Sequence, residues 1–300
     1  MNPEILGMDG ETEANRIAKR MLEIVGRQLR RRGASIAISG GVDSAVCAAL
    51  AVLAFSASKV YGLMLPETDS SSNSLIRGKM VVEQFGILFS IEDIAPTLDA
   101  LGCYRRRDEA MRAVFPDFGP DWKSKIMIAG GRNGAFNYFK LVVRSPDGEL
   151  HEKRLPPREY LQIVAATNFK QRVRKMIEYF HADRLNYAVI GTPNRLEYDQ
   201  GFFVKNGDGA ADLKPIAHLY KTQVYALARH LGIPDEICNA VPTTDTYSLQ
   251  QGQDEFYFAL AYDKMDIALW SLNHGVTEDE LASFLGIAKS HAAFIYKDII

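Results

Sequence analysis

Short apolar runs alternate with amphipathic helical stretches along much of the chain. Four runs have the length and flanking turns of buried β-strands: residues 34–39, 60–65, 87–91 and 187–191. Helical spacing marks residues 12–32, a segment that starts at Val42, and residues 75–85 and 160–182. Strands that alternate with helices over short loops predict an α/β fold with an open, mostly parallel sheet and helices on both faces.

Two regions depart from this alternation. Between Cys103 and Pro157 lies a hairpin-like stretch, KLVVRSPDGELHEKRL, in which Pro146-Asp147-Gly148 is a strong turn signal. We expect a single domain over residues 1–300 with a hairpin or flap inserted at about 103–157. After a polar loop at 192–215, the pattern is helical from Leu219 almost to the end. The C-terminal part is therefore expected to be helical.

The charge balance excludes a general polyanion-binding surface. With 35 basic and 37 acidic residues the formal net charge is -2, so no global field would hold nucleic acid or an anionic membrane. An anionic ligand must instead be held by local clusters of cations.

The apolar and cysteine patterns indicate a cytoplasmic protein. The longest apolar run, Ala45–Phe55, is short of the roughly 18 residues that a membrane span needs, and the first residues show no secretion signal. Cys47, Cys103 and Cys238 lie far apart without a CxxC pair, which argues against a disulfide framework or a cysteine-rich zinc site.

The strongest local motif is Ser39-Gly40-Gly41-Val42-Asp43-Ser44, where a strand turns into a helix. Glycines let the backbone approach a phosphate, and the exposed amides meet the positive end of the helix dipole. No lysine follows, so this is not the common P-loop. A plain strand–helix turn with capping serines is the alternative, but the full pattern is far more restrictive. It resembles the signature of the ATP pyrophosphatases, which implies a loop that cradles the pyrophosphate of ATP.

A series of short motifs in the second half narrows the comparison. They are Asn168–Arg174, Gly191–Glu197, Gly201–Lys205, Gly207–Asp212, Leu219–Lys221, Pro242–Asp245 and Gly252–Glu255. In this order and spacing they resemble the NAD synthetase family, over about residues 31–102 and 159–266.

This resemblance implies a set of site residues. Those for ATP are Ser39, Gly40, Gly41, Asp43, Ser44, Thr192, Lys221 and Thr243. Those for deamido-NAD are Arg172, Lys205 and Asp212. The resemblance implies Mg²⁺ binding by Asp43 and Glu197. The residues that it implies for catalysis are Asp43, Lys205, Asp212 and Lys221. Asp43 and Glu197 each follow a predicted strand, so both can reach the carboxyl edge of the sheet, where open α/β sheets bind ligands.

The resemblance also implies the reaction. It is the ATP-dependent amidation of the nicotinate carboxyl of deamido-NAD with ammonia, through an acyl-adenylate, to give NAD, AMP and pyrophosphate. The implied assembly is a homodimer. At 300 residues the chain is too short to add a nitrilase-type glutaminase, so we expect free ammonia or ammonia from a separate glutaminase partner.

Two alternatives stay open. One is an adenylating amide synthetase of the same superfamily that acts on a different carboxylate. The inserted region allows this, as does the absence of the family's C-terminal His-Lys pair, since only His291 and Lys297 occur there. The other is a non-catalytic nucleotide-binding protein. The joint presence of Asp43, Glu197, Lys205 and Lys221 argues against a mere binder.

Overall fold

A four-stranded parallel sheet forms the centre of the molecule in this computed structural model, which describes residues 3–129, 138–240, 247–249 and 262–299. Its strands are β1 (Ala34–Ala37), β2 (Val60–Met64), β3 (Leu88–Ile91) and β7 (Ala188–Ile190). They lie in the order β3-β2-β1-β7, and every neighbouring pair is parallel. All four predicted strands, and their parallel arrangement, are confirmed.

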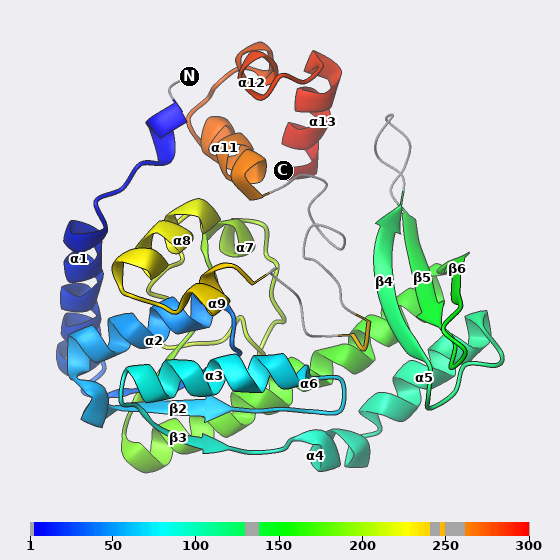
Figure 1. The fold of residues 1–300 in the computed structure, drawn as a ribbon, viewed down its shortest axis with the longest axis horizontal. Coiled ribbons are helices and arrows are strands. Elements are labelled where there is room, and N and C mark those ends of the chain that lie inside the picture. Colours follow the sequence, from blue (N-terminus) through cyan, green and yellow to red (C-terminus); the bar gives the residue numbers. More distant parts are fainter. Residues whose placement is uncertain (1–2, 130–137, 241–246, 250–261, 300) are drawn as a thin grey trace.

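Helices cover both faces of this sheet (Figure 1). One face carries α1 (Gly10–Leu22), α2 (Val42–Phe55), α3 (Ser72–Gln84) and α8 (Lys221–His230), and the other carries α6 (Pro157–Leu185). Alternate residues of β2 enter the two cores: Val60 and Met64 pack with α2, whereas Leu63 packs with Val173 of α6. This alternation follows from the two-residue period of a strand and confirms the α/β fold.

Several shorter elements connect these layers. They are η1 (Pro3–Leu6), η3 (Ala57–Lys59), α4 (Ala95–Ala100), α7 (Arg195–Asp199) and α9 (Asp235–Cys238). Helix α7 lies inside the segment 192–215 that we predicted to be a loop. The cause is a capping box, in which the Asn194 side chain accepts from the Glu197 amide and the Glu197 carboxylate accepts from the Asn194 amide.

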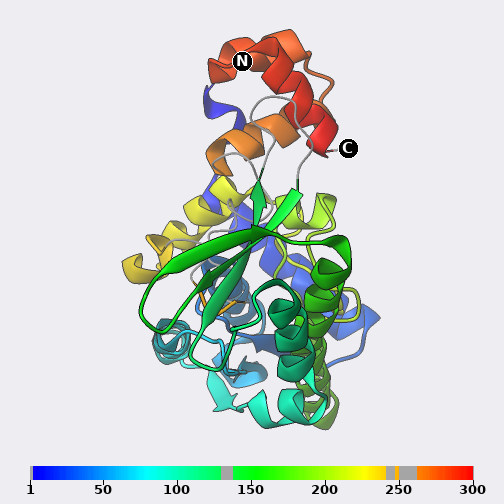
Figure 2. The same ribbon diagram turned by 90° about the vertical axis from the view of Figure 1, so that its right-hand side faces the viewer.

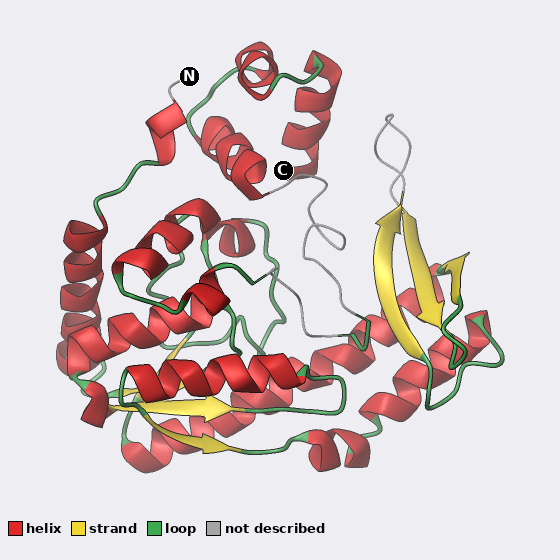
Figure 3. Cartoon of the chain, viewed as in Figure 1, coloured by secondary structure: helices red, strands yellow, loops and turns green. Residues whose placement is uncertain are grey.

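The C-terminal part is helical where it is described. Helices α11 (Tyr262–Asn273), α12 (Glu278–Leu285) and α13 (Lys289–Ile299) pack on one another and lie beyond α8 (Figure 3). The helical prediction for this region is confirmed. No helix in the described ranges is long and apolar enough to cross a membrane.

The N-terminal helix differs from the prediction of one helix over residues 12–32. The α-helix ends at Leu22, and a π-helical turn, η2 (Glu23–Gln28), follows. The backbone then reverses at Arg30, whose φ is 54°. Asn186 holds the chain after this reversal, because its carbonyl accepts from the Arg32 amide at 2.8 Å and its side chain from Arg31 at 3.0 Å.

The inserted region is larger than the predicted hairpin. It holds α5 (Cys103–Val114) and an antiparallel sheet of β4 (Lys123–Ala129), β5 (Tyr138–Arg144) and β6 (Leu150–Arg154), in the order β4-β5-β6 (Figure 2). The predicted turn between β5 and β6 is present, with Gly148 at φ 93°. A separate apolar cluster fills this region, and Ile163 of α6 and Tyr247 complete it. The insertion therefore packs on the long helix and does not close a core alone.

Candidate functional site

A cleft of about 640 Å³ opens at the carboxyl edge of the parallel sheet. The ends of β1, β2 and β7, the first turns of α2, α3 and α8, and one side of α6 line it. This is the edge at which open α/β sheets bind ligands. The predicted glycine motif between β1 and α2 therefore faces a cleft.

Hydrogen bonds within the motif shape the pyrophosphate-binding loop (residues 39–44). The Ser44 hydroxyl donates to the Gly41 carbonyl at 2.9 Å and accepts from the Ser39 amide at 3.2 Å. Gly40 has a φ of 79°, and a Cβ there would overlap the carbonyl oxygen of Ser74. Only glycine fits this backbone, so the loop lies directly against the first turn of α3.

The two predicted metal ligands converge on this cleft. Asp43, in the first turn of α2, and Glu197, in α7, both line it. Asn194 joins them, since its side-chain amide donates to Oδ1 of Asp43 at 3.2 Å and its backbone amide donates to Oε2 of Glu197 at 3.0 Å. The bond between Asn194 and Asp43 thus joins residues that lie 151 positions apart in the sequence.

A buried lysine binds one of these two carboxylates. Nζ of Lys221 binds Oδ2 of Asp43, and the lysine side chain is only 2% exposed. The start of α8 is held in turn by Asp266 of α11, which accepts from the Lys221 and Thr222 amides at 3.2 and 2.7 Å. Packing of the C-terminal helices therefore fixes a cation at the centre of the site.

The pKa values of Glu197 and Lys221 are shifted because both side chains share a buried site with Asp43. Burial, followed by the nearby charge of Asp43, raises the pKa of Glu197 to about 7. Burial alone would lower the pKa of Lys221, but Asp43 and Glu197 raise it above its ordinary value. Two acids and one lysine leave an excess of negative charge when both acids are ionised.

This excess suits a divalent cation. Mg²⁺ bound with a nucleotide takes one or two carboxylates and fills its octahedron with phosphate oxygens and water. Among the described residues, no group of three or more His, Cys, Asp or Glu side chains could hold a metal ion. If a nucleotide brings Mg²⁺ into the cleft, Asp43 and Glu197 are the carboxylates that would hold it.

The predicted dinucleotide residues fall into two groups. Arg172 and Lys205 line the cleft, and Nε of Arg172 donates to the Lys205 carbonyl at 3.2 Å. Asp212 does not line the cleft. Its carboxylate accepts a hydrogen bond from the backbone amide of Val189, in β7, at 2.7 Å. Its role in binding or catalysis stays a prediction.

Of the predicted ATP residues, Thr192 lines the cleft with the pyrophosphate-binding loop and Lys221. Thr243 lies outside the described residues. The cleft thus gathers residues from both halves of the chain.

Sequence reasoning assigned no role to three polar residues that line the cleft or bond its carboxylates. Asn194 is fully buried between the two acids, and its Asn-x-x-Glu spacing is a recognisable capping signal. Lys175 and Glu178 of α6 form a buried pair at 2.8 Å and also line the cleft. No sequence signal marked this pair, because a lysine and a glutamate three apart on a helix are usually solvated.

Comparison with known proteins agrees with this geometry. The model of the family described as NAD synthase matches residues 16–114 and 142–299. This chain belongs to the NAD synthase family. The unmatched segment, residues 115–141, covers β4 and the start of β5. The family match therefore leaves out β4 and the start of β5, whereas α5 and β6 lie within the matched residues.

Relatives within the NAD synthase family cover almost the whole chain. The NH₃-dependent NAD⁺ synthetase of Rhizobium meliloti (strain 1021) is 58% identical over 289 residues, which cover 95% of this chain and 86% of the relative. The enzyme of that name from Thermotoga maritima is 37% identical over 244 residues, 80% of each chain.

Solved structures show the same fold. The NH₃-dependent NAD synthetase from Campylobacter jejuni, in complex with nitrate, superposes with a TM-score of 0.63 at 20% identity and covers 97% of this chain and 94% of its own. The NMN synthetase from Francisella tularensis gives a TM-score of 0.59 at 24% identity, with the same coverage.

Proposed function

We propose that this protein is an ammonia-dependent NAD synthetase. It amidates the nicotinate carboxyl of deamido-NAD at the expense of ATP, and so acts as a carbon–nitrogen ligase. The observation that carries the proposal is the meeting of Asp43, Glu197 and Lys221 beside the pyrophosphate-binding loop. The family match and the 58% identical NH₃-dependent synthetase support it.

The reaction takes two steps. A nicotinate carboxylate oxygen attacks the α-phosphorus of ATP, a new P–O bond forms, and pyrophosphate leaves with the electron pair of the broken bond. Ammonia then attacks the carbonyl carbon of the acyl-adenylate, the C–N bond forms, and AMP leaves as the nitrogen loses a proton. No protein nucleophile is required, so catalysis depends on orientation and on charge stabilisation.

The cleft residues fit these demands. Amides of the pyrophosphate-binding loop at the start of α2 suit the leaving pyrophosphate, and Lys221 places a buried positive charge beside them. Arg172 and Lys205 suit the pyrophosphate of deamido-NAD. Mg²⁺, held by Asp43 and Glu197, would neutralise the charge that develops on the phosphate oxygens.

The direct test is NAD formation by the purified protein. With ATP, Mg²⁺, ammonium chloride and deamido-NAD, we expect NAD, AMP and pyrophosphate in equal amounts. Isotope exchange between pyrophosphate and ATP should require deamido-NAD. Exchange that instead requires another carboxylate from a panel would identify a different substrate, and ATP binding without exchange would indicate a non-catalytic protein.

The nitrogen source gives the first prediction. Pure protein should form NAD far faster with ammonium chloride than with an equal concentration of glutamine, because no glutaminase is expected within these 300 residues. Steady-state rates with each nitrogen source, measured at saturating ATP and deamido-NAD, provide the comparison. Equal efficiency with glutamine would contradict the proposal, whereas recovery of glutamine use on adding a separate glutaminase would agree with it.

We further propose that the protein is a homodimer that pairs through α6 and β3. Large apolar side chains are exposed on both elements, namely Met176 (64%), Phe180 (60%) and Leu88 (64%). The C-terminal half of α6 comes close to β3, because Nε2 of His181 lies 2.5 Å from Oε1 of Glu92, the residue that follows β3. Exposed apolar groups gathered on one face are typical of an interface.

The second prediction tests this pairing. The wild-type protein should have twice the mass of the 33.4 kDa chain in light scattering after gel filtration, and Met176→Glu with Phe180→Glu should shift it to one chain. Leu53→Glu is the matched control, because Leu53 is 49% exposed on α2 away from this face. A double variant that keeps the wild-type mass would contradict the assignment.

Two broader expectations belong to the same proposal. Residues 1–300 would act as one catalytic domain with the insertion at about 103–157 attached to α6. The protein would work in the cytoplasm, where its three cysteines, all free and buried, stay reduced.

A further inference from the structure

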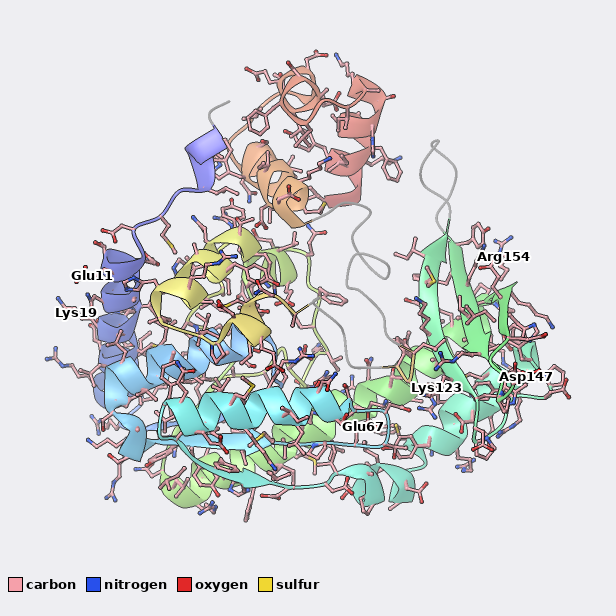
Figure 4. All side chains as sticks on the ribbon, viewed as in Figure 1. Glu11, Lys19, Glu67, Lys123, Asp147 and Arg154 are labelled. Carbon is pink, nitrogen blue, oxygen red and sulfur yellow. The ribbon has the colours of Figure 1, made fainter. Side chains whose placement is uncertain are left out.

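A buried cluster of charges lies behind the serine loop, which we define as residues 65–71, between β2 and α3. Nζ of Lys170, on α6, lies 3.0 Å from Oε1 of Glu67 and 2.6 Å from Oδ2 of Asp69. The three side chains are 1%, 0% and 6% exposed. Figure 4 labels Glu67 at this turn, beside α6. Lys170 of helix α6 therefore holds the serine loop from the buried side of the loop.

The insertion holds the same two carboxylates from the other side. The Tyr104 hydroxyl of α5 donates to Oε2 of Glu67 at 2.9 Å, and Arg107 of α5 pairs with Asp69. Burial alone would raise the pKa of Asp69, but Lys170 and Arg107 bring it below its ordinary value. The serine loop is thus held between α6 and α5 by Lys170, which contacts both carboxylates, and by Arg107 and Tyr104. Arg174 of α6 adds a hydrogen bond to the Leu65 carbonyl at 3.1 Å.

Such a cluster is an inefficient way to stabilise a fold. Taking charges out of water costs energy that their mutual attraction only partly returns, and apolar residues of similar size are often as stable. A buried network of this kind is better suited to fixing one geometry, as in other systems where buried polar groups specify a unique arrangement.

The geometry that it fixes reaches the candidate active site. Ser70, Ser71 and Ser74 line the cleft, and the Ser71 hydroxyl caps the start of α3 by accepting from the Asn73 amide at 3.2 Å. The Ser74 carbonyl oxygen then lies so close to Gly40 that no side chain fits there. A shift of the serine loop would therefore move the first turn of α3 and the pyrophosphate-binding loop that packs on it.

We propose that Lys170 is a positioning residue for this reaction, an inference that rests on the proposed function. Its ammonium group fixes Glu67 and Asp69, and thereby holds the serine loop and the start of α3 against the pyrophosphate-binding loop. Lys170 acts through this loop and not on the substrates. Because displacement of a reacting group by about 1 Å can cost ~10²-fold in rate, the step that cleaves ATP depends on it.

The test begins with Lys170→Met, which keeps an unbranched side chain one atom shorter and removes its charge. We expect kcat for NAD formation and the rate of pyrophosphate–ATP exchange to fall together by about 10²-fold. The KM for ammonia should stay within about twofold, because the second step is not displaced. Lys170→Arg, which keeps the charge, should recover part of the rate.

Two further variants separate positioning from stability. Lys140→Met is the matched control, since Lys140 pairs with Glu152 at 2.7 Å outside the cleft, with side chains that are 27% and 59% exposed; it should retain the wild-type rate. Lys170→Met with Glu67→Gln removes the unbalanced buried carboxylate and should restore the melting temperature. In this double variant the rate should stay low, because the contact that sets the loop is still absent.

The outcomes are distinct. A low rate in the stable double variant supports the positioning role, whereas recovery of the rate together with the melting temperature overturns it. A Lys170→Met protein that exchanges pyrophosphate at the wild-type rate also overturns it. A wild-type protein without NAD formation would instead overturn the proposed function, and this inference with it.

Discussion

Asp43→Asn should lower the rate of NAD formation about 10²–10³-fold, the usual cost of removing one preorganised charged group from an active site. The carboxylate of Asp43 binds Lys221 and accepts from Asn194, so an amide of the same shape keeps the packing but removes the negative charge. Both the hold on Mg²⁺ and the counter-charge of the buried lysine are lost. Initial rates at saturating substrates, together with circular dichroism, measure this effect.

Asp199→Asn is the matched control for this substitution. Asp199 lies at the end of α7, two residues after Glu197, and pairs with Arg195 at 3.1 Å. It does not line the cleft, so its variant should keep the wild-type rate. Equal rates in Asp43→Asn and Asp199→Asn would show that Asp43 has no part in the reaction.

Glu197→Gln should produce a similar loss of activity, about 10²–10³-fold, with a gain in stability. Burial and Asp43 raise the pKa of Glu197 to about 7, above its value in an unfolded chain. A raised folded-state pKa favours the folded protein at low pH, and this contribution is lost as the pH rises through about 7. Above that pH the ionised side chain destabilises the metal-free fold, and glutamine removes this cost.

Thermal melting without metal, at pH 6 and pH 8, tests the predicted gain in stability of Glu197→Gln. We expect the melting temperature of Glu197→Gln to exceed that of the wild type by about 2 °C or more at pH 8, and the difference to shrink at pH 6. A variant that is less stable at pH 8, or that retains the wild-type rate, would contradict the assigned role. A loss of activity together with a gain in stability is typical of replacing a residue that serves function at a cost in stability.

The parallel sheet could be predicted because its strands are short, apolar and separated by helices. Residues 34–39 and 60–65 read as buried strands, and β1 and β2 lie within them. The first strand of the insertion, β4, was missed because Lys123 and Lys125 flank Ser124, a polar residue that is buried where β4 pairs with β5.

The candidate site could be predicted in part. Asp43, Glu197 and Lys221 were found because each belongs to a motif, and the structure brings them together. The capping box of Asn194 with Glu197 is local and detectable from its spacing, whereas the bond from Asn194 to Asp43 spans 151 positions. The cluster of Lys170 with Glu67 and Asp69 is not, because it joins residues about a hundred positions apart that are charged and would be read as solvated.

The most direct test of the central claim is anomalous diffraction from crystals that contain Mn²⁺ and a non-hydrolysable ATP analogue. The account predicts a metal peak within coordination distance of both the Asp43 and Glu197 carboxylates and of the phosphate oxygens, beside the pyrophosphate-binding loop. A nucleotide-bound peak that touches neither carboxylate, or a nucleotide bound away from this loop, would contradict it.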